Sequence, residues 1–296
     1  MSRPQAYVTN LELRESNPDG SEGAGLSHTS KGLFLLHVLE LASYGEPRGG
    51  ATVLHDAGDH GARYEELAHV LAADGWAVAL PDLRGHGRSE GERGHSAGFR
   101  EVARDVDAIL DHLAYRMPEG PQILVGQGLG GLQALAYGVE RPGRAAALVL
   151  LSPLFEPRFR APEKRGGLKG LFQKLGPTSP GSLGWTTAMR TSDAAEQAAL
   201  AADGAVHDVI TLRAVEAFSE ARARAEGGQK ELATPVLILH GADDPIADPA
   251  RSQALARPGL EVRVLAGRKH DLLHDRGAAE VMQEIRAWLD ASVPRG

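Results

Sequence analysis

The chain has no cysteine among its 296 residues, and this absence removes several kinds of chemistry. Without thiols there is no disulfide framework, no cysteine nucleophile and no thiolate metal site. The lack of cysteine also agrees with a cytoplasmic location, where disulfides are rare. Nothing in the composition requires a metal or another cofactor, and we expect none.

Long apolar runs and an excess of basic residues are missing as well. The first residues, 1–5, lack the apolar segment of a signal peptide, and no run approaches the ~18 apolar residues of a membrane span. The formal net charge is -7, so the chain offers no overall positive field for a nucleic acid. We therefore expect a soluble, cytoplasmic protein with no nucleic-acid partner and no transmembrane segment.

Short apolar runs alternate with amphipathic segments along most of the chain. The expected strands cover 32–41, 50–54, 77–80, 121–125, 147–151, 236–239 and 262–265. The expected helices cover 64–74, 99–115, 132–139 and 278–289. This alternation predicts the α/β class, with a mostly parallel, doubly wound sheet covered by helices on both faces.

The alternation stops at Pro153 and resumes near residue 231, which predicts an inserted helical cap over 154–230. The core then comprises 32–153 and 231–296, and residues 1–31 form an N-terminal extension with a possible extra strand at 7–13. Within the cap, 194–225 is helical by composition. The basic stretch 158–174 is expected to be a solvated cap surface, with weak contact to a membrane surface as an alternative.

The glycine-rich segment 126–131 carries the most informative pattern. It follows an apolar run and precedes an Ala- and Leu-rich helix, and it has the spacing G-x-S-x-G of a nucleophile elbow with glycine at position 128. The same residues satisfy the dinucleotide pattern G-x-G-x-x-G, which requires an acidic residue about 20 positions further on. The segment 145–151 contains no carboxylate, which disfavours nucleotide binding.

Further polar segments follow other expected strands in the order that a hydrolase of this type requires. Asp244 and His270 come after the expected strands 236–239 and 262–265, in the order nucleophile, acid, base. In the loop after strand 50–54, the N–H of Ala57 is expected to point at a substrate oxyanion together with the N–H of Leu129. Gln127, next to Gly128, is a further candidate pocket residue.

Five motifs together resemble the monoacylglycerol lipase and bacterial lysophospholipase-like, or serine aminopeptidase-type, branch of the α/β-hydrolase fold. The resemblance covers about 32–291. It implies hydrolysis of monoacylglycerols or similar single-chain esters without a cofactor, Asp244 and His270 as acid and base, and a cap that shapes an acyl-chain pocket. The motifs are 63–68, 84–91, 152–154, 240–244 and 270–274.

Two positions depart from the pattern of the resembled family. Gly128 replaces the nucleophilic serine, so no acyl-enzyme can form there; deleting such a nucleophile costs on the order of a millionfold in kcat, roughly 8 kcal/mol. Asp56 replaces a glycine beside the oxyanion donors. A carboxylate some 4 to 6 Å from a developing oxyanion would oppose it by roughly 3 kcal/mol at an effective dielectric near 20.

Three explanations of the missing serine remain. The first is a hydrolase scaffold that has lost ester hydrolysis and binds an acyl or other apolar small molecule. The second is a carboxylic-ester hydrolase with altered chemistry, in which His270 acts on water, Asp244 orients the ring and Asp56 can take part. The third is an active lipase whose serine was removed on purpose.

The remaining polar residues also have structural interpretations. Asp244 and His270 can form a satisfied polar pair without catalysing anything. Ser89 and Ser152 occupy positions where the resembled family has structural serines, so we do not expect either to replace the nucleophile. The histidines of the motifs lack the spacing of a zinc site and are interpreted as loop-packing residues: His55, His60, His86 and His274.

Overall fold

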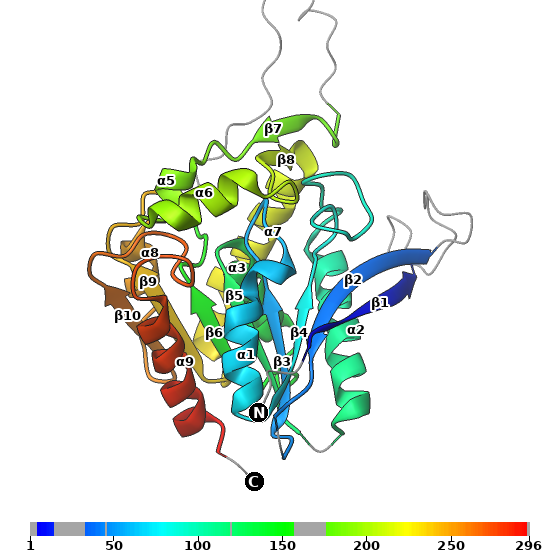
Figure 1. The fold of residues 1–296 in the computed structure, drawn as a ribbon, viewed down its shortest axis with the longest axis vertical. Coiled ribbons are helices and arrows are strands. Elements are labelled where there is room, and N and C mark those ends of the chain that lie inside the picture. The colour runs from blue at the N-terminus through cyan, green and yellow to red at the C-terminus, as the bar shows by residue number, and fades with distance from the viewer. Residues whose placement is uncertain (1–4, 15–32, 45, 119, 157–175, 295–296) are drawn as a thin grey trace, which may run out of the picture.

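The computed structural model describes residues 5–14, 33–44, 46–118, 120–156 and 176–294. A central sheet with helices on both faces makes up the body of the molecule (Figure 1). Smaller elements from the described residues between 152 and 235 lie over one end of this sheet. The mostly parallel, doubly wound α/β architecture predicted from the alternation of elements is therefore confirmed.

The sheet has eight strands in the order β1-β2-β4-β3-β5-β6-β9-β10. The first two pairings, β1 with β2 and β2 with β4, are antiparallel, and the others are parallel. The N-terminal extension supplies β1, at the position where the sequence suggested an extra strand. The strands are β1 (Tyr7–Arg14), β2 (Leu33–Leu41), β3 (Gly49–Leu54), β4 (Trp76–Pro81), β5 (Gln122–Gln127), β6 (Ala147–Leu151), β9 (Val236–Gly241) and β10 (Leu260–Leu265).

The helices cover the two faces of the sheet in separate groups. α1 (Glu65–Ala73) and α9 (Ala278–Ser292) bury their apolar residues in the core on one face. α2 (Phe99–Arg116), α3 (Leu129–Glu140) and α7 (Leu212–Gly228) do so on the other. The short elements of the core are η1 (Gly61–Tyr64), η2 (Gln229–Glu231) and α8 (Pro249–Gln253).

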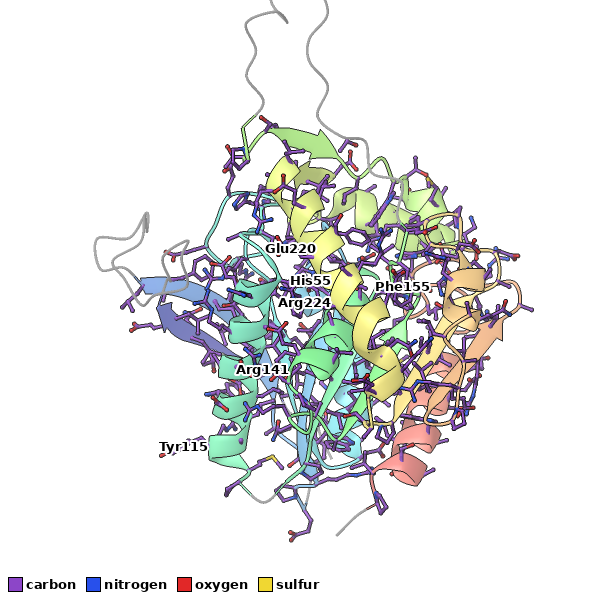
Figure 2. All side chains as sticks on the ribbon, turned by 180° about the vertical axis from the view of Figure 1, so that it is seen from behind. His55, Tyr115, Arg141, Phe155, Glu220 and Arg224 are labelled. Carbon is purple, nitrogen blue, oxygen red and sulfur yellow. The ribbon has the colours of Figure 1, made fainter. Side chains whose placement is uncertain are left out.

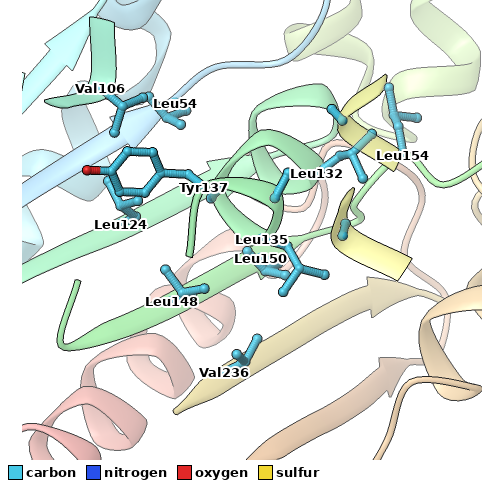
Figure 3. Packing of buried hydrophobic residues seen from close by; sticks show 14 of the residues in the cluster. Leu54, Val106, Leu124, Leu132, Leu135, Tyr137, Leu148, Leu150, Leu154 and Val236 are labelled. Atoms are coloured by element: carbon cyan, nitrogen blue, oxygen red, sulfur yellow. The ribbon is translucent and has the colours of Figure 1, made fainter. Parts of the chain in front are cut away.

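The inner strands are mainly apolar because they are covered on both faces. Every residue of β3, β4, β5, β6 and β9 is buried, as expected for parallel strands between two helical layers. Figure 3 shows the side of the core where α3 packs on the sheet, with Leu135 and Tyr137 of the helix among Leu124, Leu148 and Leu150 of the strands. This rigid sheet fixes the loops at its carboxyl edge.

Within 194–225 the structure has two helices separated by a turn and a short strand, where the sequence suggested continuous helix, so that prediction is wrong for 203–211. α6 (Ala194–Ala202) ends at Asp203, whose carboxylate accepts the N–H of Ala205. β8 (Val209–Thr211) then pairs with β7 (Pro180–Ser182), and the Thr211 side chain caps the start of α7. A further short helix, α5 (Thr187–Arg190), precedes α6.

Helix α7 is joined to the core by polar contacts along its length (Figure 2). Arg224 donates to Glu140 at 2.9 Å and lies over the ring of Phe99. Glu220 accepts the N–H of Phe99 at 3.2 Å, at the start of α2. α7 is therefore part of the wall around the carboxyl edge of the sheet.

The predicted basic stretch 158–174 lies outside the described residues. Within the described ranges, no helix is both long enough and apolar enough to cross a membrane.

Candidate functional site

Gly128 forms the sharp turn between β5 and α3. Its φ of 53° and ψ of -113° lie in a region that L side chains rarely adopt, and its N–H donates to the carbonyl of Leu151 at 2.8 Å. The strand, turn and helix expected from the sequence are all present. The turn directs the first N–H groups of α3 toward the loop after β3.

The carboxylate of Asp56 occupies the space in front of this turn. Its Oδ1 accepts two backbone hydrogen bonds, one from Ala57 N at 2.7 Å and one from Leu129 N at 2.8 Å. These are the two N–H groups that the sequence assigned to a substrate oxyanion. The carboxylate was expected to stand some distance from that position; it is instead bound directly to both donors.

Asp56 also fills the volume that a side chain at position 128 would need. A β-carbon on Gly128 would overlap Asp56 Oδ1 and would lie only 2.7 Å from Oδ2. Real β-carbons do not approach other atoms so closely. The glycine at 128 and the observed position of the aspartate at 56 therefore depend on each other.

The other oxygen of Asp56 contacts His270, which also binds Asp244. His270 Nε2 lies 3.0 Å from Asp56 Oδ2, and Nδ1 lies 2.7 Å from Asp244 Oδ2. Burial of the ring disfavours its charged form, but the charges and hydrogen bonds of the two carboxylates outweigh burial and raise the pKa of His270 to about 10. At neutral pH His270 is therefore protonated, and Asp56, His270 and Asp244 form a hydrogen-bonded triad.

Asp244 is held as an anion by several donors. Its Oδ1 accepts the N–H groups of Ile246 and Ala247 at 2.8 and 3.0 Å. Burial alone would raise its pKa, but the charge of His270 and hydrogen bonds from both histidines, His270 and His240, hold the pKa of Asp244 below its ordinary range. The carboxylate therefore stays charged next to the imidazolium.

Neighbouring residues fix the positions of the triad. His55 Nδ1 lies 2.7 Å from the carbonyl of Asp56, and His55 Nε2 accepts the N–H of Leu83 at 2.9 Å, which orients the loop after β3. Gln127 Nε2 donates to the carbonyl of His270 at 2.8 Å. Gln127 is fully buried and supports the His270 loop, whereas the sequence suggested a pocket position.

The two serines considered as replacements lie in structural settings. Ser89 Oγ donates to the carbonyl of Asp82 at 2.5 Å and accepts the N–H of His37 at 2.8 Å, so it joins its loop to β2. Ser152 is fully buried after β6, with a φ of 41°, and its N–H donates to Leu239. Within the described parts of the chain, neither hydroxyl forms a hydrogen bond with the triad.

An apolar pocket begins beside Ala57 and Leu129 and extends between α2, α3 and α7 under β8. Its cavity volume is about 50 Å³, and together with the open solvent at its mouth the hollow measures about 730 Å³. Its walls contain few charged groups, and the charges of Arg84 and Asp105 neutralise each other through contacts at 2.6 and 2.8 Å. The main apolar side chains of the wall are Leu83, Phe99, Val102, Leu183, Ile210 and Phe218.

A buried ionic cluster joins α5 to the core beside the triad. Arg190 of α5 donates to Asp59 Oδ2 at 2.6 Å and lies 3.4 Å from Asp271, the residue after His270. Arg63 contacts the same two carboxylates at 3.1 and 3.5 Å. Sequence reasoning did not select Arg190, because one arginine in a cap has no pattern that distinguishes it from a surface residue.

The histidines of the motifs are used in packing within the described parts of the chain. His86 lies between His55 and His207, with ring centroids 5.0 and 4.8 Å apart. His60 contacts Asp203, and His274 contacts Asp271. In the described ranges, no group of three or more acidic or histidine side chains is placed to hold a metal ion.

Comparison with known proteins agrees with this architecture. Residues 45–277 match the family described as serine aminopeptidase, S33. The chain is 28% identical over 254 residues to the monoacylglycerol lipase of Mycolicibacterium smegmatis, covering 82% of this chain and 89% of that protein. It is 42% identical over 110 residues to human monoglyceride lipase, covering 37% of this chain and 36% of the relative.

The solved structures give the same result. The crystal structure of the monoacylglycerol lipase of Paleococcus ferrophilus superposes with a TM-score of 0.74 at 25% identity, covering 87% of this chain and 99% of that one. Sequence, sheet topology and structural likeness thus agree: the chain belongs to the serine aminopeptidase S33 family of α/β-hydrolases.

Proposed function

We propose that this protein binds a single-chain acyl or similar apolar small molecule and does not hydrolyse esters by serine chemistry. One observation supports the absence of serine-type ester hydrolysis. The Asp56 carboxylate accepts the N–H groups of Ala57 and Leu129, next to a glycine at the turn. An internal anion therefore takes the place that an ester's oxyanion would need.

Ester hydrolysis through an acyl-enzyme needs a nucleophile, a base to activate it, and donors for the oxyanion. Gly128 supplies no hydroxyl. The donors are already bonded to a carboxylate that is fully buried. A substrate carbonyl would have to displace this anion from two charge-assisted hydrogen bonds and from its contact with His270.

Hydrolysis by water that His270 activates is the weaker candidate. A general base must be neutral before it accepts a proton, and the ideal pKa lies near the working pH. With its pKa raised to about 10, His270 is protonated at neutral pH. Its Nε2 also faces Asp56 Oδ2, so the position that an activated water would take is occupied.

A deliberate replacement of serine by glycine is also less well supported. A side chain at 128 would overlap Asp56, so a single replaced residue does not account for the arrangement. The side chain of Asp56 and the lack of a side chain at Gly128 therefore have to be explained together. This favours a natural binding site over an intact lipase that lacks one hydroxyl.

The ligand class follows from the pocket and from the relatives. Apolar pockets with few polar groups suit small apolar ligands. The wall here is made mainly of aliphatic and aromatic side chains. Relatives named monoacylglycerol lipase and monoglyceride lipase point to molecules with one acyl chain as the first ligands to test.

The test measures binding and turnover on the same proteins. Monodecanoylglycerol binding is followed by calorimetry, and release of decanoate is followed in parallel. We expect binding without turnover in the parent protein. Ala217→Phe, which puts a ring into the pocket wall, should weaken binding by at least about tenfold while the protein stays folded. Fast decanoate release by the parent, or no binding, would contradict the proposal.

Restoring the missing chemistry is a separate prediction. Gly128→Ser alone should stay inactive because its side chain overlaps Asp56, whereas Gly128→Ser with Asp56→Gly should release decanoate measurably. Gly143→Ser is the matched control, since Gly143 has a φ of 82° and open space around its α-carbon. If Gly128→Ser alone were as active as the double variant, the overlap with Asp56 would have no functional meaning.

A further inference from the structure

Gln133 is a polar side chain in the wall of the apolar pocket. It lies on α3, is 7% exposed, and lines the pocket together with Leu129, Phe99 and Phe218. Its Oε1 is buried without a hydrogen-bond partner among the described residues. A buried amide oxygen without a partner costs free energy, about 1 to 3 kcal/mol per unsatisfied group.

Other polar groups in the same wall are engaged with one another. Arg84 binds both oxygens of Asp105. His95 contacts the hydroxyl of Thr211 at 3.0 Å. The amide oxygen of Gln133 is thus an acceptor placed against the ligand space without a matching donor from the described parts of the protein.

We propose that Gln133 is a specificity-determining residue that binds a hydroxyl group carried on the apolar chain of the ligand. This inference rests on the proposed function and names its ligand more closely as an oxygenated acyl chain. A hydroxyl fits because it donates to the amide oxygen and accepts from the amide N–H. A plain alkyl chain would leave the amide oxygen unpaired.

The position of Gln133 on α3 fixes where that hydroxyl belongs. Leu129, at the end of the pocket beside the triad, and Gln133 are four residues apart, or roughly 6 Å along the helix axis. A ligand whose head group lies beside Leu129 therefore presents a mid-chain position to Gln133. A hydroxyl next to the head group or at the chain terminus would miss it.

The experiment compares methyl decanoate with methyl esters of decanoic acid that carry a single hydroxyl at successive chain positions. Calorimetry gives Kd for each ester with the parent protein. One mid-chain isomer should bind about five- to tenfold more tightly than methyl decanoate, the size expected for one or two neutral hydrogen bonds. Isomers hydroxylated at other positions should bind no better than methyl decanoate.

Gln133→Leu tests the residue itself. The preference for the hydroxylated isomer should disappear, while methyl decanoate should bind as tightly as before or more tightly because a buried polar group has been removed. Ser96→Ala, a polar residue elsewhere in the same wall, is the matched control and should keep the preference.

The outcomes separate the inference from the proposed function. If no isomer binds more tightly than methyl decanoate, or if the preference survives Gln133→Leu, the role of Gln133 is refuted while acyl-chain binding stands. If none of the esters binds to the parent protein, the proposed function fails and the inference falls with it. Thermal unfolding of Gln133→Leu shows that lost binding does not come from an unfolded variant.

Discussion

Asp56 and His270 stabilise each other as a buried pair of opposite charges. His270 has a pKa of about 10 in the folded protein, against about 6.5 in an unfolded chain. Because the folded pKa is the higher one, this stabilising contribution is complete below about pH 6.5 and is lost as the pH rises toward 10. The pair therefore stabilises the folded protein less and less as the pH rises above neutrality.

Asp56→Asn should reduce this alkaline loss. The amide keeps the shape of the carboxylate but removes one of the two negative charges that raise the pKa of His270. We expect a lower pKa in an NMR titration of the imidazole, and a smaller fall in the free energy of unfolding above neutral pH. Asp290→Asn, at an exposed position of α9, is the control. An unchanged pKa in Asp56→Asn would mean that Asp244 alone sets the charge of His270.

At the scale of single residues, the sequence predicted which side chains form the site but not which contacts Asp56 makes. Chain order and spacing brought Asp244 and His270 to one place, and the structure has them 2.7 Å apart. The consequence of Asp56 was underestimated, because its side-chain direction depends on the geometry of the loop after β3. A hydrogen bond from His55 to the backbone of that loop is not visible in any linear pattern.

Helix α5 is held to the core by Arg190, and this attachment should be costly to break. Arg190→Met would leave the fully buried Asp59 and Asp271 with one positive partner fewer. Breaking a buried pair in this way costs about 3 to 5 kcal/mol. Urea unfolding should detect a loss of this size.

Arg251→Met, in α8, is the control for Arg190→Met. Arg251 contacts Glu156 and Glu226 at the surface, where such pairs contribute about 0 to 1 kcal/mol. If both variants lost the same stability, the buried cluster would not be what attaches the cap.

At the scale of elements the core strands were predictable and the cap was only partly so. Buried parallel strands have continuous apolar runs, which a sequence displays directly. In the cap, Ala-rich composition on both sides concealed the interruption at Asp203 and Gly204. β8 forms there because its β-branched residues pair with β7 over the pocket, a tertiary contact that local composition does not contain.

Three neighbouring histidine rings are expected to make the whole molecule sensitive to acid. Burial lowers the pKa of His55 and His86, and it lowers that of His207, a cap residue, to about 4. A folded pKa below the unfolded one gives stability that is present above about pH 6.5 and is lost as the pH falls toward 4. Together with the opposite trend of His270, this places maximal stability near neutral pH.

Thermal unfolding across the pH range checks this expectation. The midpoint should fall on both sides of neutrality, and His207→Phe should flatten the acid side while leaving the alkaline side as it was. Phenylalanine keeps a ring against His86 and cannot be protonated. An acid limb that stays unchanged in His207→Phe would assign the loss to carboxylates elsewhere in the protein.

The overlap between Asp56 and a side chain at 128 also limits what a single substitution can achieve. A substitution at 128 alone would bring the new side chain against the carboxylate of Asp56. A change at position 56 alone would leave His270 without one of its two counter-charges and would supply no nucleophile. Reaching the serine and glycine pair of the resembled family from this sequence therefore takes two changes, and we expect neither single variant to hydrolyse esters faster than the parent.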